Sequence, residues 1–86
     1  MNYVINASYI QDYQIYLVFN DKKSGIIDLK KTVQNDHRAI FKELKDLKKF
    51  KNFKIDADTI VWGNGLDLAP EYLHDLLIQQ QKNDQK

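Results

Sequence analysis

Two carboxylates four residues apart, Asp67 and Glu71, are the residues of this sequence whose types and spacing could best support chemistry. A pair of carboxylates can bind a cation, or exchange protons with a substrate as general acid and base. The turn expected between them leaves their relative geometry open, and a cation site needs a third ligand. The candidates near in sequence for that third ligand are Asp58, His74 and Asp75.

The same stretch has a purely structural interpretation, which we favour. Asn64 and Gly65 form a strong turn pair because both tolerate the left-handed backbone region, and Trp62 before them would fill the core. Asp67 would accept backbone N–H groups. The proline that follows suits the first turn of a helix, and the glutamate after it favours the positive end of the helix dipole. The residues assigned to this structural motif are Trp62, Asn64, Gly65, Asp67, Pro70 and Glu71.

Other catalytic and metal-binding patterns are missing from the sequence. There is no Cys, which excludes disulfides, thiolate zinc sites and cysteine nucleophiles. Neither His37 nor His74 has a second histidine within four residues, so the ligand spacing of a zinc site is absent. Ser8 and Ser24 fall in an expected strand and turn without a nucleophile elbow, and the glycines form no phosphate-binding loop. We therefore expect no enzyme activity, no metal and no cofactor.

The basic run Lys42–Lys54 is the candidate for contact with nucleic acid. It holds six Lys and two acidic residues, with Phe50 and Phe53 among them. Lysines of this kind contact phosphates, and exposed aromatic rings could stack on bases. The alternative is a solvated helix face with two phenylalanines in the core. Arg38 is the only arginine, which argues against sequence-specific base reading.

An apolar strand face is the candidate for protein binding. In residues 13–19, alternate side chains point to opposite faces, and one of these faces carries Tyr16 and Val18. If nothing covers that face, it is an interface candidate; the alternative is partial cover by the first strand or by the chain end. We expect these two side chains to be apolar contacts, with an electrostatic rim formed by Lys45, Lys48 and Lys49.

The elements that must position these residues follow from periodicity. Alternation and β-branched residues predict three strands joined by short links, then a helix from about residue 37 to 48. Two further strands and a last helix follow. The order β-β-β-α-β-β-α predicts an α+β fold with a mainly antiparallel sheet and helices packed on one side. We expect a single domain over residues 1–78 and a polar, frayed tail over residues 79–86.

The length and the charge distribution of the chain limit the possible functions further. With 86 residues and 43% apolar content, the chain suits one small domain with a thin core. The net charge is +1, but residues 22–54 carry eleven Lys or Arg against four acids, whereas residues 55–81 carry five acids and no Lys or Arg. The N-terminus lacks a signal-peptide pattern and no apolar run reaches membrane-spanning length, so we expect a cytoplasmic protein without membrane contact.

The chain resembles a small, mostly bacterial family known only as domain of unknown function 2442. The resemblance covers about residues 3–76. It depends on a strand that ends in Asp28-Leu29, a helix with Phe41 and Leu44, and the motif Trp62–Leu73. Two positions depart from the family pattern, because Gly63 replaces a common proline and Ala69 replaces a helix-capping residue. Both changes would loosen the corner slightly.

The resemblance implies an α+β fold and no established catalytic residues. Some members are fused to a helix-turn-helix domain, and family genes often stand beside another small gene, as in toxin–antitoxin pairs. We therefore expect a non-enzymatic protein-binding module, antitoxin-like or regulatory, whose partner is another protein or a second copy of the chain. The alternatives are an accessory nucleic-acid-binding protein that uses Lys42–Lys54, and a cation or acid–base site at Asp67 and Glu71.

Overall fold

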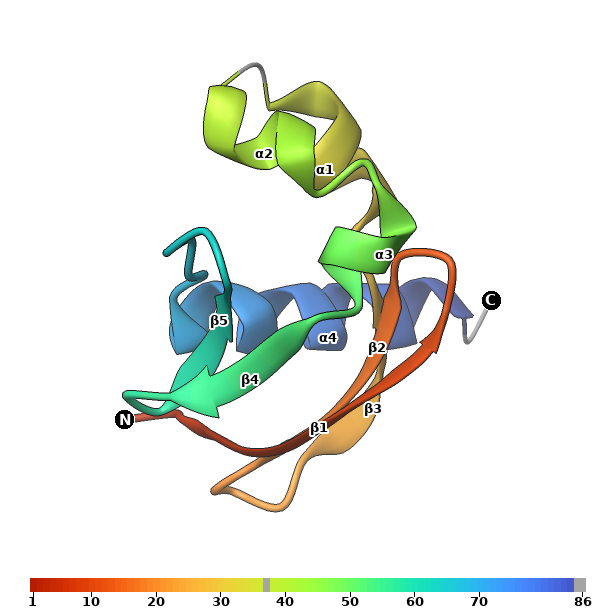
Figure 1. The fold of residues 1–86 in the computed structure, drawn as a ribbon. Helices are drawn as coiled ribbons and strands as arrows, with labels where there is room; N and C mark the ends of the chain where they lie inside the picture. Colours follow the sequence, from red (N-terminus) through yellow and green to blue (C-terminus); the bar gives the residue numbers. More distant parts are fainter. Residues whose placement is uncertain (37, 85–86) are drawn as a thin grey trace.

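The first strands of the chain form a three-stranded antiparallel sheet in the computed structural model, which describes residues 1–36 and 38–84 (Figure 1). The strands are β1 (Val4–Gln11), β2 (Gln14–Phe19) and β3 (Ser24–Asp28), in the spatial order β1-β2-β3. The side chains of the central strand alternate between two faces, as the sequence predicted, and those on one face within the strand are completely buried. These side chains are Ile15, Leu17 and Phe19.

The predicted single helix over residues 37–48 is wrong. A short helix α1 (Lys30–Asn35) precedes this region, and two further short helices, α2 (Ala39–Glu43) and α3 (Leu47–Phe50), stand in place of the predicted one. Residue 37 lies outside the described part of the chain. The chain breaks before α3 because the Asp46 carboxylate accepts the backbone N–H of Lys48 at 2.9 Å, which caps a new helix. In the same break the Tyr13 hydroxyl donates to the Lys45 carbonyl at 2.6 Å.

A β-hairpin forms a second sheet of two strands, β4 (Phe53–Asp56) and β5 (Thr59–Trp62). Its two-residue link, Ala57 and Asp58, has positive φ at both positions, 49° and 71°, which is the pattern of a type I′ turn. The Asp58 carbonyl accepts the Val4 N–H at 2.9 Å, so the hairpin is tied to the start of the first sheet.

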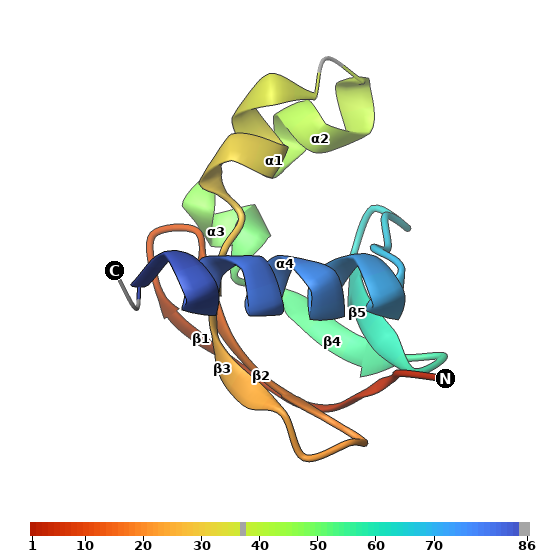
Figure 2. The same ribbon diagram turned by 180° about the vertical axis from the view of Figure 1, so that it is seen from behind.

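The last helix, α4 (Pro70–Asp84), lies across the inner side of the three-stranded sheet (Figure 2). Its apolar stripe includes Leu73 and Leu77, both fully buried. The helix continues through residues 79–84, which the polar sequence predicted as a frayed tail; residues 85–86 lie outside the described chain. The extension makes contacts of its own, because the side chains of Gln80 and Gln81 hydrogen bond to the backbone of β3.

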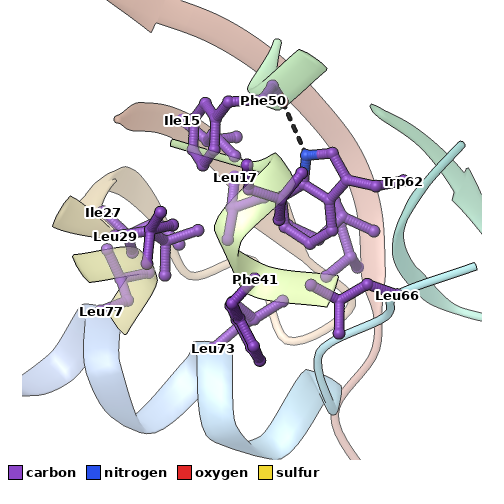
Figure 3. Close-up of a cluster of buried hydrophobic side chains, with 14 of the residues drawn as sticks. Ile15, Leu17, Ile27, Leu29, Phe41, Phe50, Trp62, Leu66, Leu73 and Leu77 are labelled. Atoms are coloured by element: carbon purple, nitrogen blue, oxygen red, sulfur yellow. Dashed lines mark hydrogen bonds between the residues drawn. The ribbon is translucent and has the colours of Figure 1, made fainter. Parts of the chain in front are cut away.

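One hydrophobic core joins both sheets and the helices (Figure 3). Trp62 is 3% exposed, and its indole N–H donates to the Phe50 carbonyl at 2.6 Å, the dashed line in Figure 3. The two antiparallel sheets with helices on one side confirm the predicted α+β fold and its element order at the coarse level. Within residues 1–36 and 38–84, none of the helices combines the length and apolar character needed to cross a membrane.

Candidate functional site

The outer face of the three-stranded sheet carries an apolar centre. Tyr16 and Val18 alternate with the buried residues of β2 and are half-buried, and Ile26 of β3 lies directly opposite Tyr16 with 48% of its surface exposed. Side chains directly opposite in an antiparallel pair share a face and touch. By register, the outer face comprises Asn6, Ser8, Gln11, Gln14, Tyr16, Val18, Ser24, Ile26 and Asp28.

This outer face is almost without charge. Charged residues make up 29% of the chain, yet Asp28 is the one Lys, Arg, Asp or Glu within the face. Its carboxylate accepts the backbone N–H of Lys30 at 2.9 Å. Depletion of charge around a tyrosine and aliphatic side chains is the composition of an interface centre.

No described helix or strand covers the outer face. The described helices lie on the inner side, where α4 crosses the sheet, and the hairpin of β4 and β5 also packs from that side (Figures 1 and 2). The predicted alternative of cover by the chain end does not occur within the described residues, because α4 carries residues 79–84 along the β3 edge instead. Tyr16 and Val18 are therefore partly exposed to solvent, and Ile26 is more so.

The lysines predicted as a rim lie elsewhere. Lys45, Lys48 and Lys49 are exposed around α3. That helix packs through Phe50 against the rings of Tyr9 and Tyr13, with ring centroids 6.3 and 5.1 Å away. The two tyrosines belong to the core side of the sheet, so the sheet separates the α3 lysines from Tyr16 and Val18. The structure does not bring the two sets into one patch.

The aromatic residues of the basic run do not offer a surface for bases. Phe50 is fully buried, and Phe53 is half-buried with its ring 6.3 Å from that of Trp62. Base stacking needs an exposed ring face. Of the residues proposed for contact with nucleic acid, only the lysines therefore remain available.

The corner after β5 is a closed turn. The Asn64 side-chain oxygen accepts the Leu66 N–H at 3.1 Å, and the Gly65 N–H reaches the Trp62 carbonyl at 3.0 Å. Gly65 has a φ of 89°, a value that favours glycine. The Leu66 carbonyl then accepts the Trp62 N–H at 2.9 Å, and Asp67 forms an isolated bridge with Val61. The chain thus reverses beside β5 before it enters α4.

Asp67 and Glu71 are both exposed in this corner. Asp67 takes part through its backbone bridge to Val61, and the nearby Leu66 N–H is accepted by Asn64. Glu71 lies in the first turn of α4. Over residues 1–36 and 38–84, no group of three or more His, Cys, Asp or Glu side chains is placed to hold a metal ion.

A contact between the buried His74 and the more exposed Asp21 escaped the sequence analysis. His74 Nε2 lies 2.7 Å from Asp21 Oδ2, and its ring packs edge-on against Phe19 with centroids 4.9 Å apart. The Lys23 N–H and the His74 ring hold the pKa of Asp21 below its ordinary value. The available signal was the position of His74, one residue after Leu73 and three before Leu77, which places it beside the buried stripe of the helix.

Comparison with known proteins yields a family without a described function. A family model described as "Protein of unknown function (DUF2442)" matches residues 4–78. No curated protein and no solved structure matches the chain.

Proposed function

The chain belongs to the DUF2442 family of proteins of unknown function, as its sequence predicted, and we propose that it works as a protein-binding domain through the outer face of its three-stranded sheet. The observation that carries this proposal is the open, nearly uncharged apolar centre formed by Tyr16, Val18 and Ile26. A side chain in such a centre gains contact area without the cost of desolvating a charge.

The mechanism we propose is occlusion. The sheet would lie against an apolar surface of a partner protein and remove it from solvent, with Tyr16 at the centre of the contact because a tyrosine supplies a large apolar area and one polar group. The lysines around α3 lie outside this contact. Their role would be to steer the approach of the partner rather than to form the rim of the interface.

The finer parts of the proposal follow from the family resemblance. They comprise a non-enzymatic, cytoplasmic role as the antitoxin-like or regulatory member of a two-gene pair, with the neighbouring gene product as the partner. A second copy of the chain is the other protein partner that the neutral face would accept, because two uncharged faces meet without repulsion.

The test is a pull-down with the tagged chain from its native host, with and without nuclease. Tyr16→Glu places a charge in the centre of the outer face, and Ile26→Glu does so on the edge strand, where folding is less sensitive. Ile55→Glu is the matched control, because Ile55 is also a strand residue, is 39% exposed and lies outside this face.

The proposal expects a stoichiometric protein that survives nuclease, is lost with Tyr16→Glu and Ile26→Glu, and is retained with Ile55→Glu. Far-UV circular dichroism verifies that each variant is folded. Binding through this face would be refuted if both outer-face variants retained the partner. It would also be refuted if the captured protein were lost on nuclease treatment.

A further inference from the structure

Two shallow hollows on the other side of the molecule meet at Asn52 and Gly63. The larger, about 280 Å³, lies between α2, α3 and the turn after Trp62, and the smaller, about 200 Å³, lies over the start of the β4–β5 hairpin. Both are smaller than the roughly 300–1,000 Å³ of pockets that enclose drug-sized ligands. Because Asn52 and Gly63 line both hollows, the two adjoin, and we treat them together as one groove that suits an extended chain.

Gly63 keeps this groove continuous. A Cβ built on Gly63 has no atom within 4 Å, and its φ is not in the positive region, so neither crowding nor backbone conformation requires a glycine there. Because Gly63 lines both hollows, a side chain at this position would project beside their junction.

The polar groups of the groove favour a negatively charged occupant. Lys49 lines the larger hollow and Lys54 the smaller, and neither forms an ion pair within the described chain. The one carboxylate of the lining is Glu43, which accepts the Asn64 side-chain amide at 3.1 Å and lies at one end. Asn52, at the junction, presents an amide that can donate to and accept from a peptide group.

The floor of the groove favours a peptide over a nucleic acid. Leu44 and Trp62 are 2% and 3% exposed, so they offer a narrow apolar floor and no ring face on which a base could stack. Phe53 and Val61 are half-buried in the smaller hollow. Small apolar side chains of an extended peptide could contact the apolar residues at the base of each hollow. In such a peptide alternate side chains point the same way, and they are roughly 6–7 Å apart.

We propose that this groove is a second binding site, for an extended acidic peptide segment of a partner protein. Carboxylates of the peptide pair with Lys49 and Lys54, its backbone pairs with the Asn52 amide, and its apolar side chains lie on the floor at Leu44 and Val61. The site is independent of the outer face, because it is formed by α2, α3, the β4–β5 hairpin and the turn after it.

Isotope-labelled protein titrated with three peptide pools tests this site by amide chemical shifts. The pools are acetylated heptapeptide amides with mixed Val, Leu and Ile at alternate positions, and with Glu, Gln or Lys at the others. The proposal expects the Glu pool to shift the amides of Asn52, Gly63 and Asn64, while Tyr16 and Ile26 stay unchanged. A single-stranded oligonucleotide serves as the competing polyanion.

Four variants test the site further. Gly63→Leu is designed to fill the junction, because a Cβ at this position has no atom within 4 Å, whereas Gly63→Ala leaves most of the junction open. Lys49→Gln with Lys54→Gln is expected to weaken binding of the Glu pool by about threefold to thirtyfold, and the matched pair Lys22→Gln with Lys82→Gln is expected to leave it unchanged. No shift with any pool, equal shifts with the Lys pool, or tighter binding of the oligonucleotide would overturn the proposal.

Discussion

His74 Nε2 and Asp21 Oδ2 lie 2.7 Å apart although 53 residues separate them in the sequence, and this contact fastens the β2–β3 turn to α4. The histidine side chain is 8% exposed and the aspartate side chain 35%. The pair is thus a polar contact at the border of the core, where a partner must be present because a buried polar group without one is costly.

The contact predicts a dependence of stability on pH. The pKa of Asp21 is lowered, so the folded chain binds fewer protons there than the unfolded chain, whose ordinary value is 3.8. The stabilisation is present above that value and is lost as the pH falls through the lower folded pKa. Asp21→Asn is therefore expected to reduce the free energy of unfolding at pH 7, and the difference from the native chain should shrink below about pH 4.

Urea unfolding from pH 7 to pH 2 measures this difference. Asp56→Asn is the control, because Asp56 is an exposed strand residue at the far end of the β4–β5 hairpin. A difference between Asp21→Asn and the native chain that stays constant over the whole range would contradict the account.

The indole of Trp62 predicts a second effect. Trp62→Phe leaves the buried Phe50 carbonyl without its donor and creates a small cavity, so the free energy of unfolding should fall by about 2–4 kcal/mol. Chemical denaturation measures it, and Phe53→Leu, at a half-buried neighbour, is expected to cost less. A loss below about 1 kcal/mol for Trp62→Phe would show that the hydrogen bond contributes little.

The glutamines of α4 predict a third effect, at the sheet edge. Gln80 accepts the Asp28 N–H at 2.8 Å and donates to its carbonyl at 3.0 Å, and Gln81 donates to the Ser24 carbonyl at 2.9 Å. Because β3 is an edge strand, these bonds occupy backbone groups that could pair with another chain. Changing both to Ala should cost about 1–2 kcal/mol and increase self-association in sedimentation experiments.

Gln79→Ala is the matched control for the edge, since Gln79 is exposed on the same helix turn and has no hydrogen bond to β3 in the described chain. If the double variant sediments and unfolds like Gln79→Ala, the glutamines do not protect the edge.

The exposed carboxylates of the corner predict a null result. Asp67→Asn and Glu71→Gln should each change the free energy of unfolding by less than about 0.5 kcal/mol, because both side chains are exposed. Magnesium or calcium should leave the melting temperature unchanged in the native chain. A rise with either ion that disappears in Asp67→Asn would restore the alternative of a cation site.

The fold class could be predicted because its signals are local. The alternation in residues 13–19 predicted two faces with Tyr16 on one of them, and the structure buries Ile15 and Leu17 on the other. This arrangement depends only on the period of a strand. The turn at Asn64 and Gly65 was visible for a similar reason, because these residue types tolerate a backbone that others avoid.

The features that the sequence analysis placed wrongly or missed depend on contacts between residues distant in sequence. The helix break at Asp46 is completed by Tyr13, 32 residues from Lys45, and periodicity carries no record of that contact. The position of Lys48 and Lys49 relative to Tyr16 depends on which side of the sheet α3 takes, which the packing of Phe50 decides. The pairing of Asp21 with His74 is of the same kind.

The central claim, that a partner protein covers the outer face, is tested most directly by photo-crosslinking in the native host. A photoreactive phenylalanine analogue would replace Tyr16 in one variant and Ile55 in another, two partly exposed strand positions on different sheets. The account predicts one discrete crosslinked protein from position 16 and none from position 55. No product from position 16, or the same product from both positions, would contradict it.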